Sequence, residues 1–516
     1  MPSPPALFPV WRELLCDGET PVAVLARLRE RPDQHAFLLE SVVGGERWAR
    51  WSIIGVGHRA VVRGAWRDGR LVVECEPGPG FAADLAELSG PRGGFGEGSG
   101  AALIEALLDR YRAGPDPDAP PGEHDELPRF WGGLVGVWGH DMVRDLERVP
   151  TPDWAEQDAS ALPAFELLVT DTLVVFDNLS QKVRVLATAC PAEDGGVDRA
   201  REAARARVDA VITALRTGPT LAPMILDEGV AAPPARLAAA WAGSRYPEQV
   251  VRAKQHIVAG DVFQVVLSQR FDQPRAEASP LDVYRMLRVT NPSPYMYLLD
   301  LPSATLAGAS PEVLVRVDHE DRRVTVRPIA GTRRRGRDLA EDLALERELL
   351  EDPKERAEHL MLIDLGRNDI GRIAAPGSVE VSESFVIERY SKVMHIVSEV
   401  SGTLAEGLGV VDALRSTFPA GTLSGAPKVR ALEIIDELEP APRGWYGGAV
   451  GYFGFDGGAD FAICIRSVVF AGDSVRVQAG AGIVYDSDPE AEDDECARKA
   501  AAVLRAIEMA RVGGAS

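Results

Sequence analysis

The chain has 516 residues, 46% of them hydrophobic, so it is long enough for a large core or several domains. A formal net charge of −22 argues against nucleic acid or an acidic membrane as a general partner, although a local basic site can still bind an anionic substrate. The five cysteines form no C-x-x-C pair and are typical of reduced thiols in a cytoplasmic protein. The N-terminus lacks the features of a signal peptide, and no apolar run is long enough to span a bilayer.

The first half of the chain contains short runs of alternating apolar and polar residues, which predict antiparallel strands. In chain order we expect a helix over 25–31, strands over 37–41, 48–55, 60–63, 70–74 and 132–139, a hairpin over 167–177 and 182–187, and a helix over 198–215. Asp68-Gly69 predicts a tight turn between two of these strands. A glycine-rich run over 91–100 lacks the Lys-Ser/Thr of a P-loop and is interpreted as a surface loop.

A segment rich in Gly, Pro and Ala over 217–236 is the best candidate for a boundary. After it we expect helices over 247–260, 281–289, 338–366 and 428–438, strands over 262–270, 295–299, 304–309, 313–317, 323–327, 447–455, 460–470 and 474–479, and a closing helix. Strands in series with few β-α-β units predict an α+β fold, a large antiparallel β-sandwich flanked by helices. Two regions, 1–235 and 236–516, would each leave open sheet edges alone, so we expect them to be intertwined as one unit.

The last predicted strand and the helix after it carry the first candidate site. Backbone N–H groups at Gly480-Ala481-Gly482 form a concavity that suits a small carboxylate. Glu492, Glu495 and Lys499 follow at positions i, i+3 and i+7, on one face of the helix and at the upstream end of its apolar stripe. Inward-facing carboxylates need a cation. The alternative is a solvated acidic first turn that the helix dipole favours.

A second acidic helix start lies at Glu355 and Glu358, after Asp352 as a plausible N-cap. Glu355 also fits a capping box, in which it only binds backbone. If both pairs of glutamates converge, four carboxylates would repel each other unless a divalent cation lies between them. Oxygen ligands without a His or Cys cage favour Mg²⁺, but the sequence alone does not show that the two helices meet.

Three further side chains have both a structural and a functional interpretation. Thr422, in a hydroxyl-rich turn, either caps a helix or hydrogen-bonds a substrate. His395, within an apolar run, is more often a core histidine that binds backbone. Arg466, at a predicted strand end, either forms a salt bridge or clamps a carboxylate.

Five sequence blocks, which follow each other along the chain, contain most of these candidate residues. They are GASPE from Gly308, RPIAGTR from Arg327, ERAEHLMLIDLGRND from Glu355, FPAGTLSGAPK from Phe418 and GAGIVYDSDPEAEDDE from Gly480. Through them, residues 246–510 closely resemble the chorismate-utilising enzymes. LLES from Leu38 and NPSPYM from Asn291 are similar to blocks of one branch of that family, component I of the anthranilate synthases.

The resemblance implies an enzyme that converts chorismate and ammonia to anthranilate and pyruvate with Mg²⁺, the first committed step of tryptophan biosynthesis. The implied catalytic residues are Glu312 as general acid, His395 and Thr422 along the ring, and Gln264. The implied metal ligands are Glu358 and Glu495 directly, and Glu355 and Glu492 through water. Lys499 and the metal would neutralise the ring carboxylate. The other implied substrate-binding residues are Arg466, Tyr452, Gly480, Ala481, Gly482, Gly331 and Thr332.

Two positions favour anthranilate synthase over its relatives. Isochorismate- and salicylate-forming enzymes carry a lysine base where this chain has Gln264, and ammonia, already a nucleophile, needs no such base. Aminodeoxychorismate synthases carry a nucleophilic lysine where this chain has Ala330. None of the cysteines lies in a G-x-C-x-G elbow, so the resemblance implies that a separate glutamine amidotransferase subunit supplies ammonia in a hetero-oligomer.

The family's tryptophan feedback pocket is implied at Glu40, Ser41, Arg50, Asn291, Pro292, Ser293, Pro294, Tyr295 and Met296. Two other interpretations stay open. One is a 2-amino-2-deoxyisochorismate synthase, which stops before pyruvate is lost. The other is a non-catalytic tryptophan-binding regulator on the same scaffold.

Overall fold

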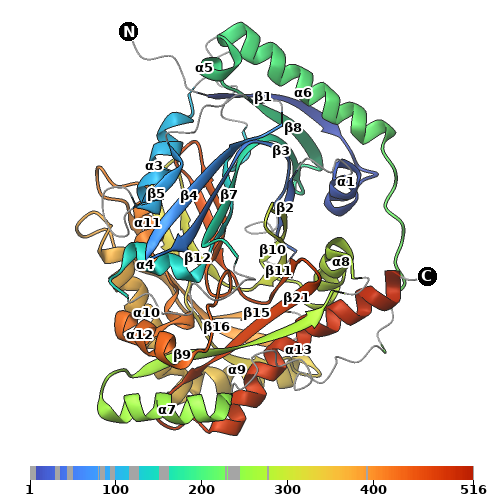
Figure 1. Cartoon of the computed structure of the whole chain (residues 1–516). Helices are drawn as coiled ribbons and strands as arrows, with labels where there is room; N and C mark the ends of the chain where they lie inside the picture. Colours follow the sequence, from blue (N-terminus) through green and yellow to red (C-terminus); the bar gives the residue numbers. More distant parts are fainter. Residues whose placement is uncertain are drawn as a thin grey trace.

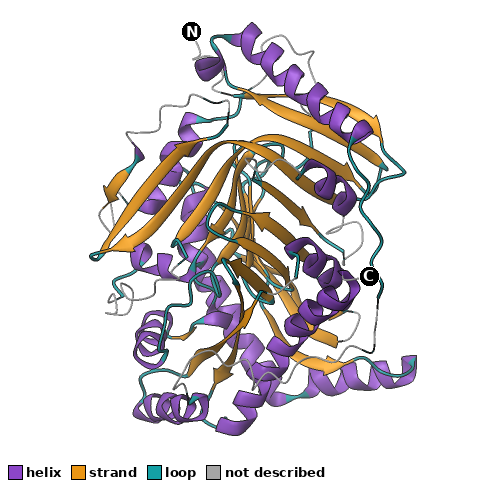
Figure 2. Ribbon diagram, turned by 45° about the vertical axis from the view of Figure 1, so that its right-hand side comes forward, coloured by secondary structure: helices purple, strands orange, loops and turns teal. Residues whose placement is uncertain are grey.

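The protein was analysed as a computed structural model, which describes residues 7–29, 35–42, 50–79, 81, 88–92, 99–114, 127–149, 162–226, 229, 245–275, 278–390 and 393–514. Strands form the interior and helices lie on the outside (Figure 2). Every pairing between named strands is antiparallel, which confirms the predicted α+β fold with its large antiparallel sheet. Within the described part, no helix is both long and apolar enough to cross a membrane.

The N-terminal part begins with an edge strand and ends with a long helix that packs on it. Its elements are β1 (Phe8–Leu15), α1 (Pro21–Leu28), β2 (Ala36–Glu40), β3 (Trp51–Arg67), β4 (Arg70–Pro77), β5 (Gly90–Arg92), α3 (Gly100–Arg110), β6 (Gly133–Trp138), η3 (His140–Met142), α4 (Val143–Leu146), β7 (Phe165–Asp177), β8 (Lys182–Ala189), α5 (Pro191–Asp194) and α6 (Val197–Thr217). Helix α6 lies along β1 and β8 at the top of Figure 1.

The C-terminal part supplies most of the helices near the cavity described below. Its elements are α7 (Tyr246–Ala259), β9 (Gln264–Pro274), α8 (Pro280–Thr290), β10 (Tyr295–Asp300), β11 (Thr305–Ser310), β12 (Val313–Val317), β13 (Arg323–Val326), β14 (Ile329–Arg334), α9 (Leu339–Glu351), α10 (Pro353–Gly371), β15 (Glu380–Arg389), β16 (Val393–Thr403), α11 (Val410–Thr417), η6 (Gly421–Leu423), β17 (Gly425–Ala426), α12 (Lys428–Leu438), β18 (Ala449–Gly454), β19 (Ala459–Ile463), β20 (Ser467–Ala471), β21 (Ser474–Ile483) and α13 (Pro489–Gly514).

Two runs of strands start from the long β3–β7 pair. One continues from β3 through β2, β10, β11, β20, β21 and β9 to β17. The other continues from β7 through β6, β18, β19, β12 and β13 to β16, which also pairs with β14 and β15. The N-terminal strands β2, β3, β7 and β6 therefore lie together in the middle of the order, and C-terminal strands join them on both sides, at β10 beside β2 and at β18 beside β6.

The structure differs from the expected elements where backbone geometry interrupts a pattern. The strand expected over 460–470 is divided into β19 and β20, because Arg466 adopts a positive φ of 52°. The helix expected over 338–366 is two helices: Asp352 caps the backbone N–H groups of Lys354 and Glu355, and Pro353 begins α10. Most of the expected loop over 91–100 and the second part of the boundary over 217–236, apart from residue 229, lie outside the described residues, so the division into two regions stays a prediction.

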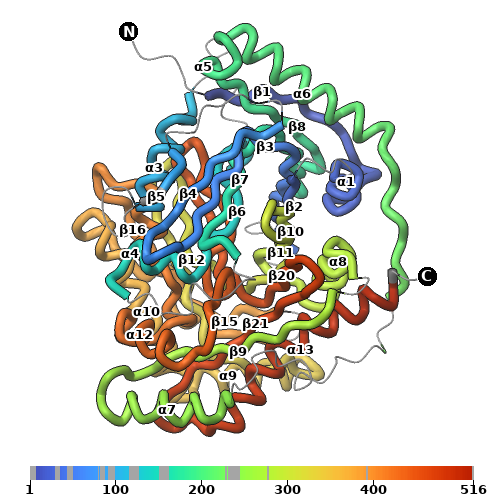
Figure 3. The backbone as a smooth tube through the Cα atoms, viewed as in Figure 1, coloured from blue at the N-terminus to red at the C-terminus, as the bar shows by residue number. Residues whose placement is uncertain are grey.

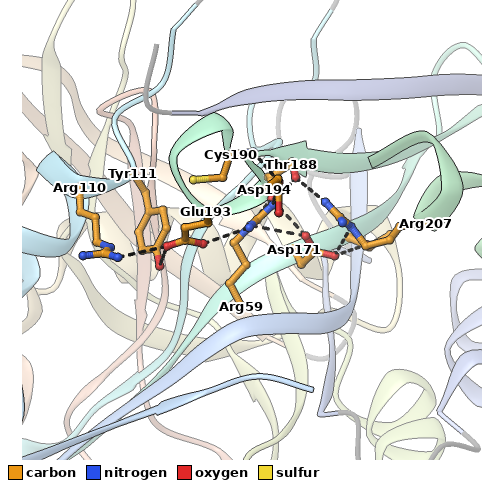
Figure 4. A network of polar contacts seen from close by, with 10 residues as sticks. Arg59, Arg110, Tyr111, Asp171, Thr188, Cys190, Glu193, Asp194 and Arg207 are labelled. Carbon is orange, nitrogen blue, oxygen red and sulfur yellow. Dashed lines mark hydrogen bonds and ion pairs between the residues drawn. The ribbon is translucent and has the colours of Figure 1, made fainter. Parts of the chain in front are cut away.

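A buried ionic network fastens the N-terminal helices to the sheet (Figure 4). The fully buried Arg59 of β3 forms ion pairs with Asp171 of β7 at 3.6 Å and with Glu193 and Asp194 of α5 at 3.1 and 3.4 Å. Tyr111, at the end of α3, donates a hydrogen bond to the Glu193 carboxylate at 2.9 Å. One cation thus joins four segments, and its removal would leave several carboxylates buried without a partner.

We expect Arg59→Met to lower the free energy of unfolding by about 3–5 kcal/mol, the usual cost of breaking a buried ion pair on one side. Arg12→Met is the matched control. The pair of Arg12 with Asp209 is more than half exposed, so its loss should cost less than about 1 kcal/mol. Urea unfolding followed by circular dichroism measures both, and equal losses would contradict the assigned role of Arg59.

Candidate active site

A cavity of about 450 Å³ lies beside the first residues of β9 and the last residues of β21, two strands that pair with each other. Its walls come from β9, β14, β16, β21, the η6 turn and the first turns of α10 and α13. In Figure 3, β9 (green) and β21 (red) run side by side above α7 and α13. The cavity collects nearly all the residues that the sequence implicates in catalysis.

The alternation of β9 and β21 decides which side chains reach this cavity. Gly480 lies opposite Ser268 and Gly482 opposite Val266, so Gly480 and Gly482 line the cavity. The side chain of Ala481, whose backbone is predicted to bind substrate, is fully buried on the opposite face of the strand, and the role of that backbone stays a prediction. At Gly482 a Cβ would lie only 2.5 Å from Nε2 of Gln264, so a larger residue there would displace that side-chain amide.

Arg466 presents a guanidinium to the cavity. It occupies the break between β19 and β20, where its φ of 52° is uncommon for a residue with a side chain and marks a site under constraint. Burial lowers the pKa of Arg466 from its ordinary value. No described carboxylate forms an ion pair with it, so the predicted salt-bridge alternative is wrong for this part of the chain. The geometry fits a receptor for an anion.

Tyr446, not the predicted Tyr452, lies in the cavity beside Arg466. The hydroxyl of Tyr446 would be 2.9 Å from a Cβ placed on Gly480. Tyr452 points away because it belongs to β18, where it stacks on Phe130 with ring centroids 4.2 Å apart. A glycine-flanked aromatic ahead of a strand, as in the run Gly444 to Gly448, was the available sequence signal for Tyr446. Gln478 and Lys354 also line the cavity and were missed.

Glu312 combines burial with a single close donor. It follows β11, and Thr422 Oγ1 of η6 donates a hydrogen bond to its Oε1 at 3.0 Å. Burial raises the pKa of Glu312 to about 7, while the Thr422 bond and the charge of Lys499 act in the opposite direction. A carboxyl with a pKa near neutrality can deliver a proton at pH 7, as a general acid must.

His395, on β16, lines the same cavity as Glu312. Its Nδ1 lies 3.0 Å from the carbonyl oxygen of Gly331 and 3.0 Å from Thr332 Oγ1. Burial lowers the pKa of His395, so the imidazole is neutral at pH 7. The carbonyl accepts the Nδ1 proton, which fixes the tautomer and leaves Nε2 as an acceptor. Gly331 is at a φ of +66°, a conformation that favours glycine.

Four glutamates from two helices line one wall of the same cavity: Glu355 and Glu358 of α10, and Glu492 and Glu495 of α13. Burial raises the pKa values of Glu358 and Glu492, and in each case the charge of a neighbouring glutamate adds to the effect. Glu358 also accepts a hydrogen bond from Gln264. The two acidic helix starts therefore meet, as their sequence patterns allowed.

The donor set of this wall fits a hard divalent cation. All four donors are carboxylates, which suit Mg²⁺. Two of them are held by cations, Glu495 by Lys499 at 2.8 Å and Glu355 by Arg333 at 3.3 Å. In these positions, no three described His, Cys, Asp or Glu side chains are spaced to coordinate one ion. Burial and the charge of a neighbouring glutamate raise the pKa values of Glu358 and Glu492 despite the opposing charge of Lys354, so a bound cation would stabilise both carboxylates.

A second cavity, of about 100 Å³, lies between β2, β10 and β18. Of the predicted regulatory residues, it is lined by Glu40, Ser41, Pro294, Tyr295 and Met296. The predicted Arg50 is not in the lining and instead pairs with Asp177 at 3.0 Å. The predicted Asn291, Pro292 and Ser293 also lie outside the lining, in the turn that leads from α8 into β10.

Glu312 should make the stability of the protein depend on pH. Its folded pKa of about 7 exceeds the ordinary value of 4.5, so its favourable contribution is complete below pH 4.5 and is lost as the pH rises through 7. We expect Glu312→Gln, which cannot ionise, to gain about 1–3 kcal/mol in free energy of unfolding relative to the unchanged protein between pH 4.5 and pH 8. Denaturant titrations at both pH values measure the difference, and a constant difference would contradict it.

The chain was compared with known proteins. The chorismate binding enzyme family matches residues 101–505. Anthranilate synthase component 1 of Pseudomonas putida is 45% identical over 98% of this chain and 96% of its own length, and that of Aquifex aeolicus is 41% identical over 98% and 95%.

Solved structures agree. Anthranilate synthase component I of Streptococcus pneumoniae superposes with a TM-score of 0.69 at 35% identity over 90% of this chain and 94% of its own. The menaquinone-specific isochorismate synthase of Escherichia coli, 18% identical over 98% of this chain and 95% of its own, shares the fold at a TM-score of 0.67. This chain belongs to the chorismate binding enzymes and, within them, to the anthranilate synthase component 1 family.

Proposed function

We propose that this enzyme is the aminase subunit of an anthranilate synthase, which converts chorismate and ammonia to anthranilate, pyruvate and water. The observation that carries the proposal is the arrangement within one cavity of Glu312, a carboxyl with a pKa of about 7, and Arg466, a guanidinium with which no carboxylate of the described residues forms an ion pair. Chorismate carries two carboxylates and a hydroxyl leaving group, and this cavity offers a partner for each of them.

The two ends of the cavity bind the two carboxylates of the substrate. Arg466, the Tyr446 hydroxyl and the backbone at Gly480 and Gly482 hold the carboxylate of the enolpyruvyl arm. Lys499 lies toward the acidic wall, where its Nζ donates to the carbonyl oxygen of Gly480 at 2.8 Å and can attract the ring carboxylate. A dianion held at both ends cannot rotate, and this restraint supplies much of the catalysis by orientation.

Glu312 gives its proton to the C4 hydroxyl, which leaves as water when the C4–O bond breaks. The nitrogen lone pair of ammonia forms the new bond at C2, and the ring double bonds shift. Loss of the C2 proton and cleavage of the bond between C3 and the enolpyruvyl oxygen then release pyruvate and leave the aromatic amine. Neutral His395 has its acceptor Nε2 free of the Gly331 contact and lies along the ring.

Two wall positions favour ammonia as the nucleophile. Gln264 donates to Glu358 and has no basic group with which to activate water. Ala330 lines the cavity and offers no covalent nucleophile. The relatives are named component 1, which supports a second component, a glutamine amidotransferase, as the ammonia source. The same set of residues also carries the alternative of an aminodeoxyisochorismate product, so the product must be identified directly.

Mg²⁺ is proposed as the cofactor. Glu358 and Glu495 would hold it directly, with Glu355 and Glu492 acting through water. When bound, it would neutralise the ring carboxylate of chorismate. The chain's own part is to place oxygen donors from α10 and α13 along one wall and to orient Glu358 through the hydrogen bond from Gln264.

Feedback inhibition by L-tryptophan is proposed for the second cavity. Its residue Tyr295 on β10 lies opposite Ser310 of β11, two residues before Glu312. Strand β11 in turn pairs with β20, which begins directly after Arg466. A ligand that displaces β10 would therefore move both ends of the catalytic cavity, a physical route for inhibition.

The protein with chorismate, Mg²⁺ and ammonium should form anthranilate, which fluorescence detects. Glu312→Gln should lower kcat about 10²–10⁴-fold, because the general acid is lost. The exposed Glu320→Gln is the control and should retain full activity. A folded protein without product would contradict the proposal, and a non-aromatic amine identified by mass spectrometry would favour the alternative enzyme.

Removal of the metal with a chelator should abolish turnover, and added Mg²⁺ should restore it. Glu358→Gln and Glu495→Gln should weaken Mg²⁺ binding about 10–100-fold, measured by calorimetry in the absence of substrate. The control is Glu490→Gln, which changes an exposed carboxylate in the first turn of α13. This variant should bind Mg²⁺ normally. Equal affinity in all three variants would contradict the assigned ligands.

L-Tryptophan should inhibit the enzyme, and Ser41→Phe should raise the inhibitory concentration at least about 10-fold because the new ring fills the second cavity. Turnover without tryptophan should change little. Ser180→Phe, in an exposed hairpin turn, serves as the control. Unchanged tryptophan sensitivity of Ser41→Phe would remove the assignment of this cavity.

A further inference from the structure

A buried ion pair lies directly behind the catalytic cavity without lining it. Glu439 follows the last turn of α12, and Arg443 lies four residues later, with each side chain only 2% exposed. Arg443 Nη2 and Nε donate to the two carboxylate oxygens of Glu439 at 2.6 and 2.9 Å. Removing two charges from water costs free energy, so the pair needs further hydrogen bonds. These bonds show which segments the pair connects.

The remaining donors of Arg443 bind backbone that forms the cavity. Nη1 donates to the carbonyl oxygen of Leu423 at 2.6 Å, and Nη2 donates to that of Val266 at 2.7 Å. Both residues line the cavity. Leu423 immediately follows Thr422, whose hydroxyl donates to Glu312. One guanidinium thus fixes the η6 turn against β9, and with it the partner of the general acid.

Glu439 extends the same hydrogen-bond network to β21, a third segment that lines the cavity. Its Oε1 accepts hydrogen bonds from the Ser268 backbone N–H at 2.8 Å and from the Ser268 hydroxyl at 2.9 Å. Because that hydroxyl proton is directed at Glu439, Ser268 Oγ accepts from Gln478 Nε2 at 2.8 Å. Gln478 lines the cavity from β21. The pair therefore connects η6, β9 and β21.

We propose that Arg443 is a positioning residue, which holds Leu423 and through it Thr422 so that Thr422 stays bonded to Glu312. The inference rests on the proposed function, because it concerns the general acid of that reaction. A purely structural role would lower stability alone. A positioning role also changes how Glu312 behaves, because a hydroxyl displaced by a fraction of an ångström loses its hydrogen bond.

Loss of the hydrogen bond from Thr422 changes the pKa of Glu312 in a definite direction. Burial raises the pKa of Glu312, and the Thr422 hydrogen bond lowers it, so without that bond the pKa increases further. The other titratable or charged groups that act on Glu312 are Lys499 of α13 and Tyr390, and His395 and Arg466 share the cavity. Because a general acid works when protonated, the alkaline limb of kcat/KM for chorismate should move to higher pH.

Two variants test Arg443 without leaving a buried charge unpaired. Arg443→Lys keeps the charge for Glu439, but one ammonium cannot reproduce the planar fork that binds two carbonyl groups and a carboxylate. Glu439→Gln with Arg443→Met removes both charges together. We expect each to lower kcat about 10–100-fold, to leave KM for chorismate within about threefold, and to move the alkaline limb upward.

Thr422→Val provides the reference for the shift, since it removes the bond directly. Arg443→Lys combined with Thr422→Val should show no shift beyond that of Thr422→Val alone, because both changes break the same contact. Arg59→Met lowers stability far from the cavity and should leave the alkaline limb in place. Additive shifts, or a folded Arg443 variant with unchanged kcat and limb, would overturn the inference. If the unchanged protein forms no anthranilate, the proposed function fails and this inference fails with it.

Discussion

Burial of ionisable groups around the cavity is the physical constraint on which the rest of the site depends. Burial raises the pKa of Glu312 to about 7 and lowers that of Arg466, and in such a buried setting each group would interact more strongly with a polar or charged ligand than it would in water. The same burial makes the acidic wall formed with Glu358 costly without a cation. Under the proposed function, a substrate carboxylate would offset the cost at Arg466 and a metal ion the cost at the acidic wall.

The sheet and a buried ion pair hold the segments around the cavity together. C-terminal strands join the N-terminal strands on both sides, at β2–β10 and β6–β18, and β11 connects the second cavity with the segment that carries Glu312. Behind the cavity, Arg443 and Glu439 join three of its walls with hydrogen bonds of 2.6–2.9 Å. The groups around the cavity come from β9, the segment after β11, β16, η6 and α13. Hydrogen bonds between the strands and to the buried ion pair keep these distant segments in place.

Periodicity and motifs predicted the fold class and most of the cavity. Glu355, Glu358, Glu492 and Glu495 were placed correctly on one wall because helix spacing fixes the face of each pair. Tyr452 was assigned to the cavity although it belongs to β18, none of whose residues lines the cavity. The turn that carries Tyr446 and the buried bonds of Arg443 depend on tertiary contacts, which no local pattern contains.

The most direct test is a crystal structure of Glu312→Gln with chorismate and Mg²⁺, because this variant should bind substrate without turning it over. The account predicts the enolpyruvyl carboxylate on Arg466 and Tyr446, the C4 hydroxyl within hydrogen-bond distance of residue 312, and the ring carboxylate beside a metal held by Glu358 and Glu495. Chorismate bound in the reverse orientation, or in another cavity, would contradict it.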